Sequence, residues 1–504
     1  MTTPLRLFNS LTRELETFEP VHPGEARVYS CGPTVYNYPH IGNMRAYVFA
    51  DVLGRTLSWK GYKLTHVINI TDVGHLTDDA DAGEDKLEKA AASQEQSIWD
   101  IAEHYKQAYW SDVRALNIRQ PAQWTVATDY VSQMIEFAEG IADKHCYQLD
   151  GGLYFDVSSV ADYGRLARSV TDEGEGRIEA VEGKRNAADF AIWRTTPAGE
   201  TRQMEWDSPW GRGAPGWHLE CSVMSGAVLG FPFDIHTGGI DHREIHHPNE
   251  IAQNQAHCCT NGLNDAANSG AKIWMHNNFL VERSGKMSKS AGEFLRLQLL
   301  IDKGCHPLAY RLMCLQAHYR SELEFSWDGL GAALTRLKRM VMQVEALKSR
   351  HAELVSASIS QPGAAGREEK WTLKQVQGDE LGKLNPFLEK FDTAISDDLN
   401  TPLALTAFEE VLAIKKVDAA DKLRMIEAMD AVLGLDLGRL ARADLRLRPA
   451  DAQIAEAEIE AALARRKEAR AARDFAASDA IRDELAAKGV EVMDGDPLGW
   501  EWKL

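Results

Sequence analysis

Apolar and polar positions near the start of the chain follow the periods of a strand, a helix and a second strand. The segment 27–31, Arg-Val-Tyr-Ser-Cys, predicts a short strand, and the Gly-, Pro- and Asn-containing stretch 33–43 predicts a loop. Apolar side chains at helical spacing over 46–60, closed by Gly61, predict a helix, and 63–70 predicts the next strand. This order is typical of a parallel nucleotide-binding sheet.

The same order of strand, helix and strand is predicted over 231–236, 249–257 and 272–281. We therefore expect an α/β fold in which both sets form one Rossmann-like, doubly wound parallel sheet, within a catalytic domain spanning 1–304. The stretch between the sets, about 117–216, lacks this order and predicts an insertion between the two halves of the fold.

After Gly304 the pattern becomes helical and predicts an α-helical bundle over 305–445. A Ser-, Gly- and Gln-containing stretch without a period interrupts it at about 351–380, and we interpret this stretch as a surface insertion. Two further helical segments and an aromatic ending predict a small separate domain over 446–504.

Composition narrows the class of protein. Of the 504 residues, 44% are hydrophobic and 26% are charged, which is typical of a folded globular protein rather than a disordered or fibrous one. No stretch reaches the about 20 apolar residues of a membrane-spanning helix, and no secretory signal is evident, so we expect a cytoplasmic protein without membrane contact. The net charge of -19 argues against a general nucleic-acid coat protein but not against a nucleic-acid enzyme. The seven cysteines lack Cys-x-x-Cys spacing, which favours free thiols or metal ligands over disulfides.

Two segments are candidates for binding phosphate groups. The first is Gly-Lys-Met-Ser-Lys-Ser at 285–290, where the ammonium groups of Lys286 and Lys289 can neutralise a polyphosphate as its charge shifts. The second is His-Ile-Gly-Asn at 40–43, where a helix N-terminus offers free N–H groups, Gly42 allows close approach and His40 can donate to a phosphate oxygen. Taken singly, a solvated basic turn and a helix cap explain them better.

Together, the two segments resemble the His-Ile-Gly-His and Lys-Met-Ser-Lys-Ser signatures of the class I aminoacyl-tRNA synthetases. They follow the first and last strands of the predicted sheet, at the carboxyl ends where such folds bind nucleotides. Asn43 replaces the last histidine of the first signature, and Asn can still donate a hydrogen bond. The resemblance assigns catalysis to His40, Asn43, Lys286 and Lys289.

Longer segments resemble the cysteinyl-tRNA synthetase family, from about residue 7 to the C-terminus except for 351–380. They are 29–36, 69–72, 216–222, 246–250 and 397–402, which include Tyr-Ser-Cys-Gly-Pro-Thr-Val-Tyr, Gly-Trp-His-Leu-Glu-Cys-Ser and His-His-Pro-Asn-Glu. The resemblance implies ATP-dependent ligation of L-cysteine to the 3' end of cysteine tRNA through a cysteinyl-adenylate, in translation.

In that family a zinc ion lies in the amino-acid pocket, and the resemblance assigns one Zn2+ per chain to Cys31, Cys221, His246 and Glu250. His246 and Glu250 are four residues apart, so both could face one side of a helix that begins near Pro248, and the mixed set of S, N and O donors suits zinc. Such a metal would separate cysteine from serine by ligand softness, so that no editing site is needed. The alternative is that the cysteines are small buried hydrophobes, which is usual for a lone cysteine.

The same resemblance assigns the rest of the pocket. Substrate cysteine would contact Gly32, Thr71 and Trp217, although tryptophans more often serve in packing. ATP, bound with Mg2+, would contact His40, Gly42, Asn43, Gly238, Gly239, Asp241 and Lys289. A tight turn is the alternative explanation of the Gly-Gly pair. His242, His247 and His257 are interpreted as structural or helix-terminal.

Contacts with tRNA are predicted in the two C-terminal domains. The bundle offers Arg336, Lys338 and Arg339, where a solvated charged face is the alternative. In the last domain, a basic helix face precedes Trp500 and Trp502, whose rings could stack on anticodon bases. The alternative is a helix with internal ion pairs. The basic residues are Arg465, Arg466, Lys467, Arg470 and Arg473.

Two other functions fit parts of the sequence. A paralogous ligase of mycothiol synthesis joins activated cysteine to an amino sugar with the same pocket, but it lacks the C-terminal domain that this chain retains. A tRNA-binding or regulatory protein without catalysis is disfavoured by the intact Lys-Met-Ser-Lys-Ser segment and the full set of implied zinc ligands. We expect a monomer whose partners are cysteine tRNA, L-cysteine and ATP.

Overall fold

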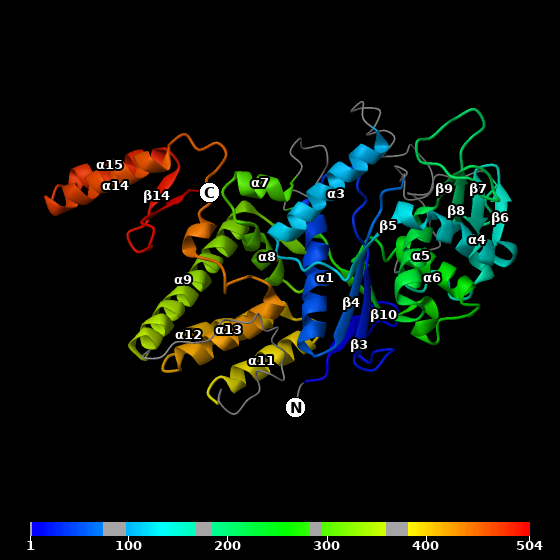
Figure 1. Cartoon of the computed structure of the whole chain (residues 1–504), viewed down its shortest axis with the longest axis horizontal. Coiled ribbons are helices and arrows are strands. Elements are labelled where there is room, and N and C mark those ends of the chain that lie inside the picture. Colours follow the sequence, from blue (N-terminus) through cyan, green and yellow to red (C-terminus); the bar gives the residue numbers. More distant parts are fainter. Residues whose placement is uncertain (1–2, 74–96, 168–182, 283–294, 359–381, 504) are drawn as a thin grey trace.

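A five-stranded parallel sheet, in the order β11-β10-β3-β4-β5, lies at the centre of the molecule (Figure 1). The structure is a computed structural model that describes residues 3–73, 97–167, 183–282, 295–358 and 382–503. Its strands are β3 (Glu25–Ser30), β4 (Lys63–Ile70), β5 (Gln123–Val126), β10 (Phe233–Gly239) and β11 (Ala271–Asn277). The connecting helices include α1 (Ile41–Trp59), α3 (Ile98–Ala115), α5 (Trp217–Leu229) and α6 (His246–His257). The predicted α/β fold is therefore confirmed.

The strand order brings distant parts of the chain together. β3 and β10 pair in parallel although about 200 residues separate them, and Val28 lies opposite Ile235. From β3 the chain proceeds to β4 on one side, whereas β10 lies on the other. At such a reversal of strand order, a crevice opens at the carboxyl ends of the strands. The candidate site is built there.

Local signals placed most of these elements correctly. β4 spans the predicted range 63–70, whereas α1 begins at Ile41 rather than at 46. The helix starts earlier because His40 and Asn43 cap it reciprocally: His40 Nδ1 accepts from Asn43 N at 3.2 Å, and Asn43 Oδ1 accepts from His40 N at 3.1 Å. The predicted strand 272–281 divides into β11 and β12 (Leu280–Glu282).

The central sheet extends into the range 117–216 that the sequence predicted as an insertion. β5 lies inside that range and pairs in parallel with β4. It has only four residues, which is too short for an alternating pattern to be recognised. A separate antiparallel sheet follows, in the order β6-β7-β8-β9. Its strands are β6 (Cys146–Leu149), β7 (Gly152–Phe155), β8 (Phe190–Thr195) and β9 (Gly213–Pro215).

The helical region packs directly against α1, the helix that follows β3 in the chain. Its principal helices are α8 (Pro307–Leu315), α9 (Trp327–Ser358), α11 (Asn385–Ser396), α12 (Thr401–Ala413) and α13 (Ala419–Leu433). One hydrophobic core includes Val48 and Val52 of α1 together with Leu312, Val341 and Val432 of the bundle. Among the residues that the structure describes, no helix is long and apolar enough to cross a membrane.

A buried charge network reinforces this packing. Asp51 of α1 accepts hydrogen bonds from Arg55 Nε at 2.7 Å and from Arg311 Nη2 of α8 at 2.6 Å. Arg311 also donates to the Leu433 carbonyl of α13 at 2.8 Å. Burial alone would raise the pKa of Asp51, but the Arg55 and Arg311 guanidinium groups lower it below the ordinary value. One ionised carboxylate therefore holds α1, α8 and α13 together.

The C-terminal elements form a small unit with its own core. Trp500 and Trp502 are 0% and 3% exposed, so the prediction that their rings are open to stacking is wrong. They are buried because the aliphatic part of this core is small, and two large rings complete it. The elements are α14 (Glu456–Ala471), α15 (Phe475–Ala487), β14 (Val490–Val492) and β15 (Trp500–Trp502).

The Asp51 network predicts a large stability effect. Asp51→Asn removes the carboxylate and leaves the fully buried Arg311 without its partner, so we expect the free energy of unfolding to fall by about 3–5 kcal/mol. Lys390 and Glu410 form an exposed pair in the bundle, and Lys390→Gln should change that free energy by less than about 1 kcal/mol. Urea unfolding measures both variants, and equal losses would contradict a special contribution from Asp51.

Candidate active site and metal centre

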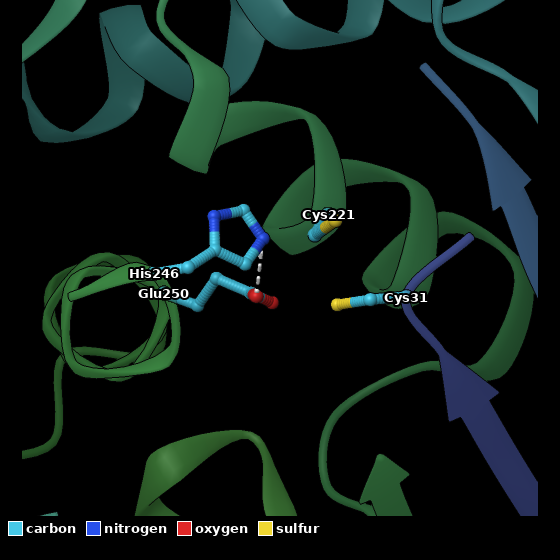
Figure 2. Close-up of side chains that lie close together, drawn as sticks. All are labelled: Cys31, Cys221, His246 and Glu250. Carbon is cyan, nitrogen blue, oxygen red and sulfur yellow. Dashed lines mark ion pairs between the residues drawn. The ribbon is translucent and has the colours of Figure 1, made fainter. Parts of the chain in front are cut away.

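Four side chains meet in the crevice between β3 and β10. Cys31 directly follows β3, and its backbone N–H donates to the Thr237 carbonyl of β10 at 3.0 Å. Cys221 projects from the second turn of α5, and His246 and Glu250 project from the start of α6. Figure 2 shows the four side chains pointing toward one another from these three parts of the chain.

The geometry of this cluster suits a metal ion. One ligand atom from each of the four residues lies within 4.8 Å of all the others. His246 Nε2 is 3.0 Å from Glu250 Oε1, because positions four apart share a face of α6, which begins at His246 rather than near Pro248. Glu250 Oε1 is fully buried, and apart from this ion-pair contact with His246 it has no hydrogen-bond partner among the described residues, so it is available as a ligand. Two sulfurs, one imidazole and one carboxylate match the donors and number that zinc takes.

The electrostatics of the cluster favour the deprotonated forms of Cys221 and Glu250 and the protonated forms of Cys31 and His246. The hydrogen bond with Cys31 lowers the pKa of Cys221 to about 6 in spite of burial, whereas burial and the nearby Cys221 raise the pKa of Cys31. Burial opposes ionisation of Glu250, yet His236 and His246 lower its pKa to about 2. Although burial opposes it, the nearby Glu250 and Cys221 raise the pKa of His246 to about 10. The site thus holds an anionic carboxylate and a thiol that ionises readily, and a bound cation would displace the protons of Cys31 and His246.

Further histidines orient three of the four side chains. His236 Nε2 lies 2.9 Å from Glu250 Oε2, and His218 Nδ1 lies 3.0 Å from His246 Nδ1. His247 Nε2 is 3.3 Å from Cys31 Sγ. Such partners fix the rotamers of metal ligands. His247 therefore supports the site as well as the fold, and the sequence analysis did not identify His218 or His236. The lone histidine in the strand pattern 231–236 gave no sign of this role.

The residues assigned to the substrate pocket lie around the cluster. The Trp217 ring stacks on His246, with centroids 4.3 Å apart and planes at 29°. Thr71 Oγ1 donates to Glu220 Oε2 at 3.0 Å, which places it beside α5. A Cβ at Gly32 would meet the Asn69 carbonyl oxygen at 1.7 Å, so only glycine fits at this position. Sequence analysis gave no role to Asn69 or Glu220, although both lie in its matching segments.

The residues assigned to ATP are only partly within the described chain. His40, Gly42 and Asn43 lie at the N-terminus of α1, whose first turn carries no acidic residue. A Cβ at Gly238 would come within 2.7 Å of the His247 ring, and one at Gly239 within 2.3 Å of Asp241 Oδ1. Lys286 and Lys289 lie outside the described residues. Leu295 lies beyond them, and its carbonyl accepts from Ile41 N at 2.8 Å.

Several cations predicted to contact tRNA are already paired. Arg336 donates to both carboxylate oxygens of Glu409, at 2.7 and 2.9 Å. Lys338 lies 2.5 Å from Glu501, and its side chain is only 12% exposed. The predicted phosphate contact of Lys338 is therefore wrong, because a carboxylate of the C-terminal unit covers it. On α14, Arg466 and Arg470 pair with Asp494 of the turn between β14 and β15, so these cations are paired across the unit rather than within the helix.

This fold and site define a class I tRNA synthetase. Residues 17–335 match the family of tRNA synthetases class I (C) catalytic domains, and 455–497 match the cysteinyl-tRNA ligase anticodon binding domain. A solved methionyl-tRNA synthetase from Mycobacterium tuberculosis in complex with methionyl-adenylate shares the fold. Its TM-score is 0.54 at 14% identity, over 84% of this chain and 93% of that one.

The sequence relatives identify the family within this class. The cysteine–tRNA ligase of Novosphingobium aromaticivorans is 76% identical over 503 residues, which cover 100% of this chain and 98% of the relative. That of Zymomonas mobilis is 54% identical, again over 100% of this chain and 98% of the relative. The chain therefore belongs to the cysteine–tRNA ligase family.

Metal content tests the cluster directly. We expect the purified protein to hold about one zinc ion per chain, and Cys221→Ser to lose it on dialysis, because a hydroxyl replaces a thiolate ligand. Cys258→Ser changes an exposed thiol at the end of α6 and should retain the zinc. Elemental analysis of the dialysed proteins measures this. A full zinc complement in Cys221→Ser would contradict the assignment.

Proposed function

We propose that the chain charges cysteine tRNA in two steps. The cysteine carboxylate attacks the α-phosphate of ATP, which gives cysteinyl-adenylate and releases pyrophosphate. A hydroxyl of the terminal tRNA ribose then takes the acyl group and releases AMP. The observation that carries this proposal is the Cys31–Cys221–His246–Glu250 cluster, of which only Cys31 is half-buried and the rest buried, at the crevice of a class I synthetase sheet.

Selection of cysteine over serine is the task of this cluster. A pocket that reads shape alone separates such similar side chains by only about 1–3 kcal/mol. A bound zinc would supply a soft Lewis acid to which the substrate thiol could coordinate as a further ligand. The chain's own contribution is to hold four ligands in fixed positions from β3, α5 and α6, with His236 and His218 fixing Glu250 and His246. Trp217 beside His246 would close the pocket around the substrate.

Catalysis of adenylate formation is assigned to positioning and charge rather than to a side-chain nucleophile. The N-terminus of α1, with His40 and Asn43, would stabilise the phosphates through N–H groups and the helix dipole. Gly238 and Gly239 would lie beside the adenosine at the end of β10, where a Cβ would clash with His247 or Asp241. Lys286 and Lys289 would bind the triphosphate of ATP, which enters with Mg2+, and stabilise the developing charge.

Binding of tRNA would extend from the crevice to the C-terminal unit. The proposed domains are 1–304 for catalysis, 305–445 for the bundle and 446–504 for the anticodon. Since Trp500 and Trp502 are buried, Phe475 at the start of α15 takes their place as the ring open to a base, with 61% of its surface exposed. It lies two residues after Arg473.

Charging with and without chelator tests the proposal. We expect unfractionated tRNA to accept labelled cysteine but not serine, and chelation of zinc to abolish charging, because selection depends on thiol coordination. Pyrophosphate exchange that depends on cysteine, without any tRNA charging, would contradict the tRNA step. Equal acceptance of serine would contradict the selection mechanism.

Truncation separates the two steps. Removal of all residues after Ala450 should leave cysteine-dependent pyrophosphate exchange unchanged and sharply weaken tRNA charging. Phe475→Ala should do the same more mildly, by about 1–3 kcal/mol of tRNA binding, since one stacked ring is lost. Both activities are measured on each protein. If exchange falls as far as charging, the C-terminal unit serves the catalytic domain and not the tRNA.

A further inference from the structure

The C-terminal unit is set apart from the rest of the molecule. Figure 1 shows α14 and α15 beyond the end of the helical bundle, at a distance from the central sheet. The four elements of the unit pack mainly against one another. Ile459, Leu485, Val490, Trp500 and Trp502 belong to a hydrophobic core that is separate from the core of the bundle. Apolar packing therefore contributes little to the orientation of this unit.

A buried ionic cluster joins the unit to the bundle. Arg442, in the short helix η5 (Arg442–Leu445), donates from Nε to Asp496 at 2.8 Å and from Nη2 to Glu501 at 2.5 Å. Lys338 of α9 reaches the same Glu501 oxygen at 2.5 Å. All four side chains are at most 12% exposed. We call these four residues the tail junction.

The charges of the tail junction are divided between the two sides. Both cations belong to the bundle, and both carboxylates belong to the C-terminal unit. Withdrawal of charges from water is costly unless they are well paired, so alternative orientations that keep the four groups buried but unpaired are disfavoured. The planar guanidinium of Arg442 also holds two carboxylates in fixed directions, which a single ammonium cannot do. The tail junction therefore specifies one orientation.

A fixed orientation of the C-terminal unit would favour the binding of a tRNA that contacts two distant sites. Two domains without a large apolar interface move relative to each other by default. A ligand that must reach two sites at once binds best when the distance between them is set in advance. One tRNA has to reach the crevice with its 3' end and the C-terminal unit with its anticodon, if the function proposed above holds.

We infer that Arg442, with Lys338, is a positioning residue for tRNA charging, which acts by holding Asp496 and Glu501 so that the C-terminal unit faces the anticodon while the 3' end lies in the crevice. It touches neither ATP nor cysteine. The inference rests on the proposed function, and it adds the residues that connect the two ends of the tRNA-binding surface.

Steady-state kinetics of Arg442→Met and Lys338→Met test this inference. We expect each variant to lower kcat/KM for tRNA by roughly tenfold or more, mainly through a higher KM, since the linkage of two binding sites is weakened. Cysteine-dependent pyrophosphate exchange should be unchanged. Arg442→Lys retains the charge but cannot bridge both carboxylates, so it should recover part of the loss. Lys390→Gln, which breaks an exposed pair within the bundle, should match the unaltered protein.

The kinetic comparison is made only among variants whose C-terminal unit is shown to be folded. The rings of Trp500 and Trp502 are 5.1 Å apart at 86°, and their coupled circular-dichroism band reports that fold. If Arg442→Met loses this band, the kinetics of Lys338→Met test the inference instead, because that change leaves Arg442 and all residues of the C-terminal unit in place. Unchanged kcat/KM for tRNA in a folded variant would overturn the inference. If truncation after Ala450 also leaves charging intact, the anticodon function fails instead.

Discussion

The pairing of β3 with β10 is the contact on which the functional site depends. It places Cys31, at the end of β3, against β10 through the hydrogen bond from its backbone N–H to the Thr237 carbonyl. The helices α5 and α6, which flank β10 in the chain, then bring Cys221, His246 and Glu250 to the same crevice. Without this pairing Cys31 would lie apart from the other three side chains, which the packing of α5 on α6 brings together.

The same sheet is anchored to the parts that would carry tRNA. Asp51 connects α1 to α8 and α13, and a shared hydrophobic core continues that contact through the bundle. Helix α1, whose N-terminus carries His40 and Asn43, is thus also the helix that packs against the bundle. Beyond the bundle the connection changes from apolar packing to the ionic contacts of the tail junction. Rigidity from the crevice to the C-terminal unit therefore depends on a few buried charges.

Sequence patterns predicted the periodic helices and strands. They did not predict which side chains are buried by distant parts of the chain. Strand β4 and helix α6 carry clear periods and were located to within a few residues, whereas β5 has four residues and left no period. The cluster of four implied metal ligands rested on resemblance, since spacing relates only His246 to Glu250. Trp500, Trp502 and Lys338 were assigned to the surface, because no local pattern shows that a tryptophan completes a small core or that a lysine is covered by a carboxylate from a distant strand.

Direct contact between the substrate thiol and a metal held by the cluster can be observed in a cobalt-substituted protein. Co2+ takes the same ligands as zinc and absorbs light, and each bound thiolate adds a charge-transfer band in the near ultraviolet. We expect cysteine to increase this band with saturation at about one equivalent per metal, and serine to leave it unchanged. Binding of cysteine without any change in the cobalt spectrum would contradict selection by thiol coordination.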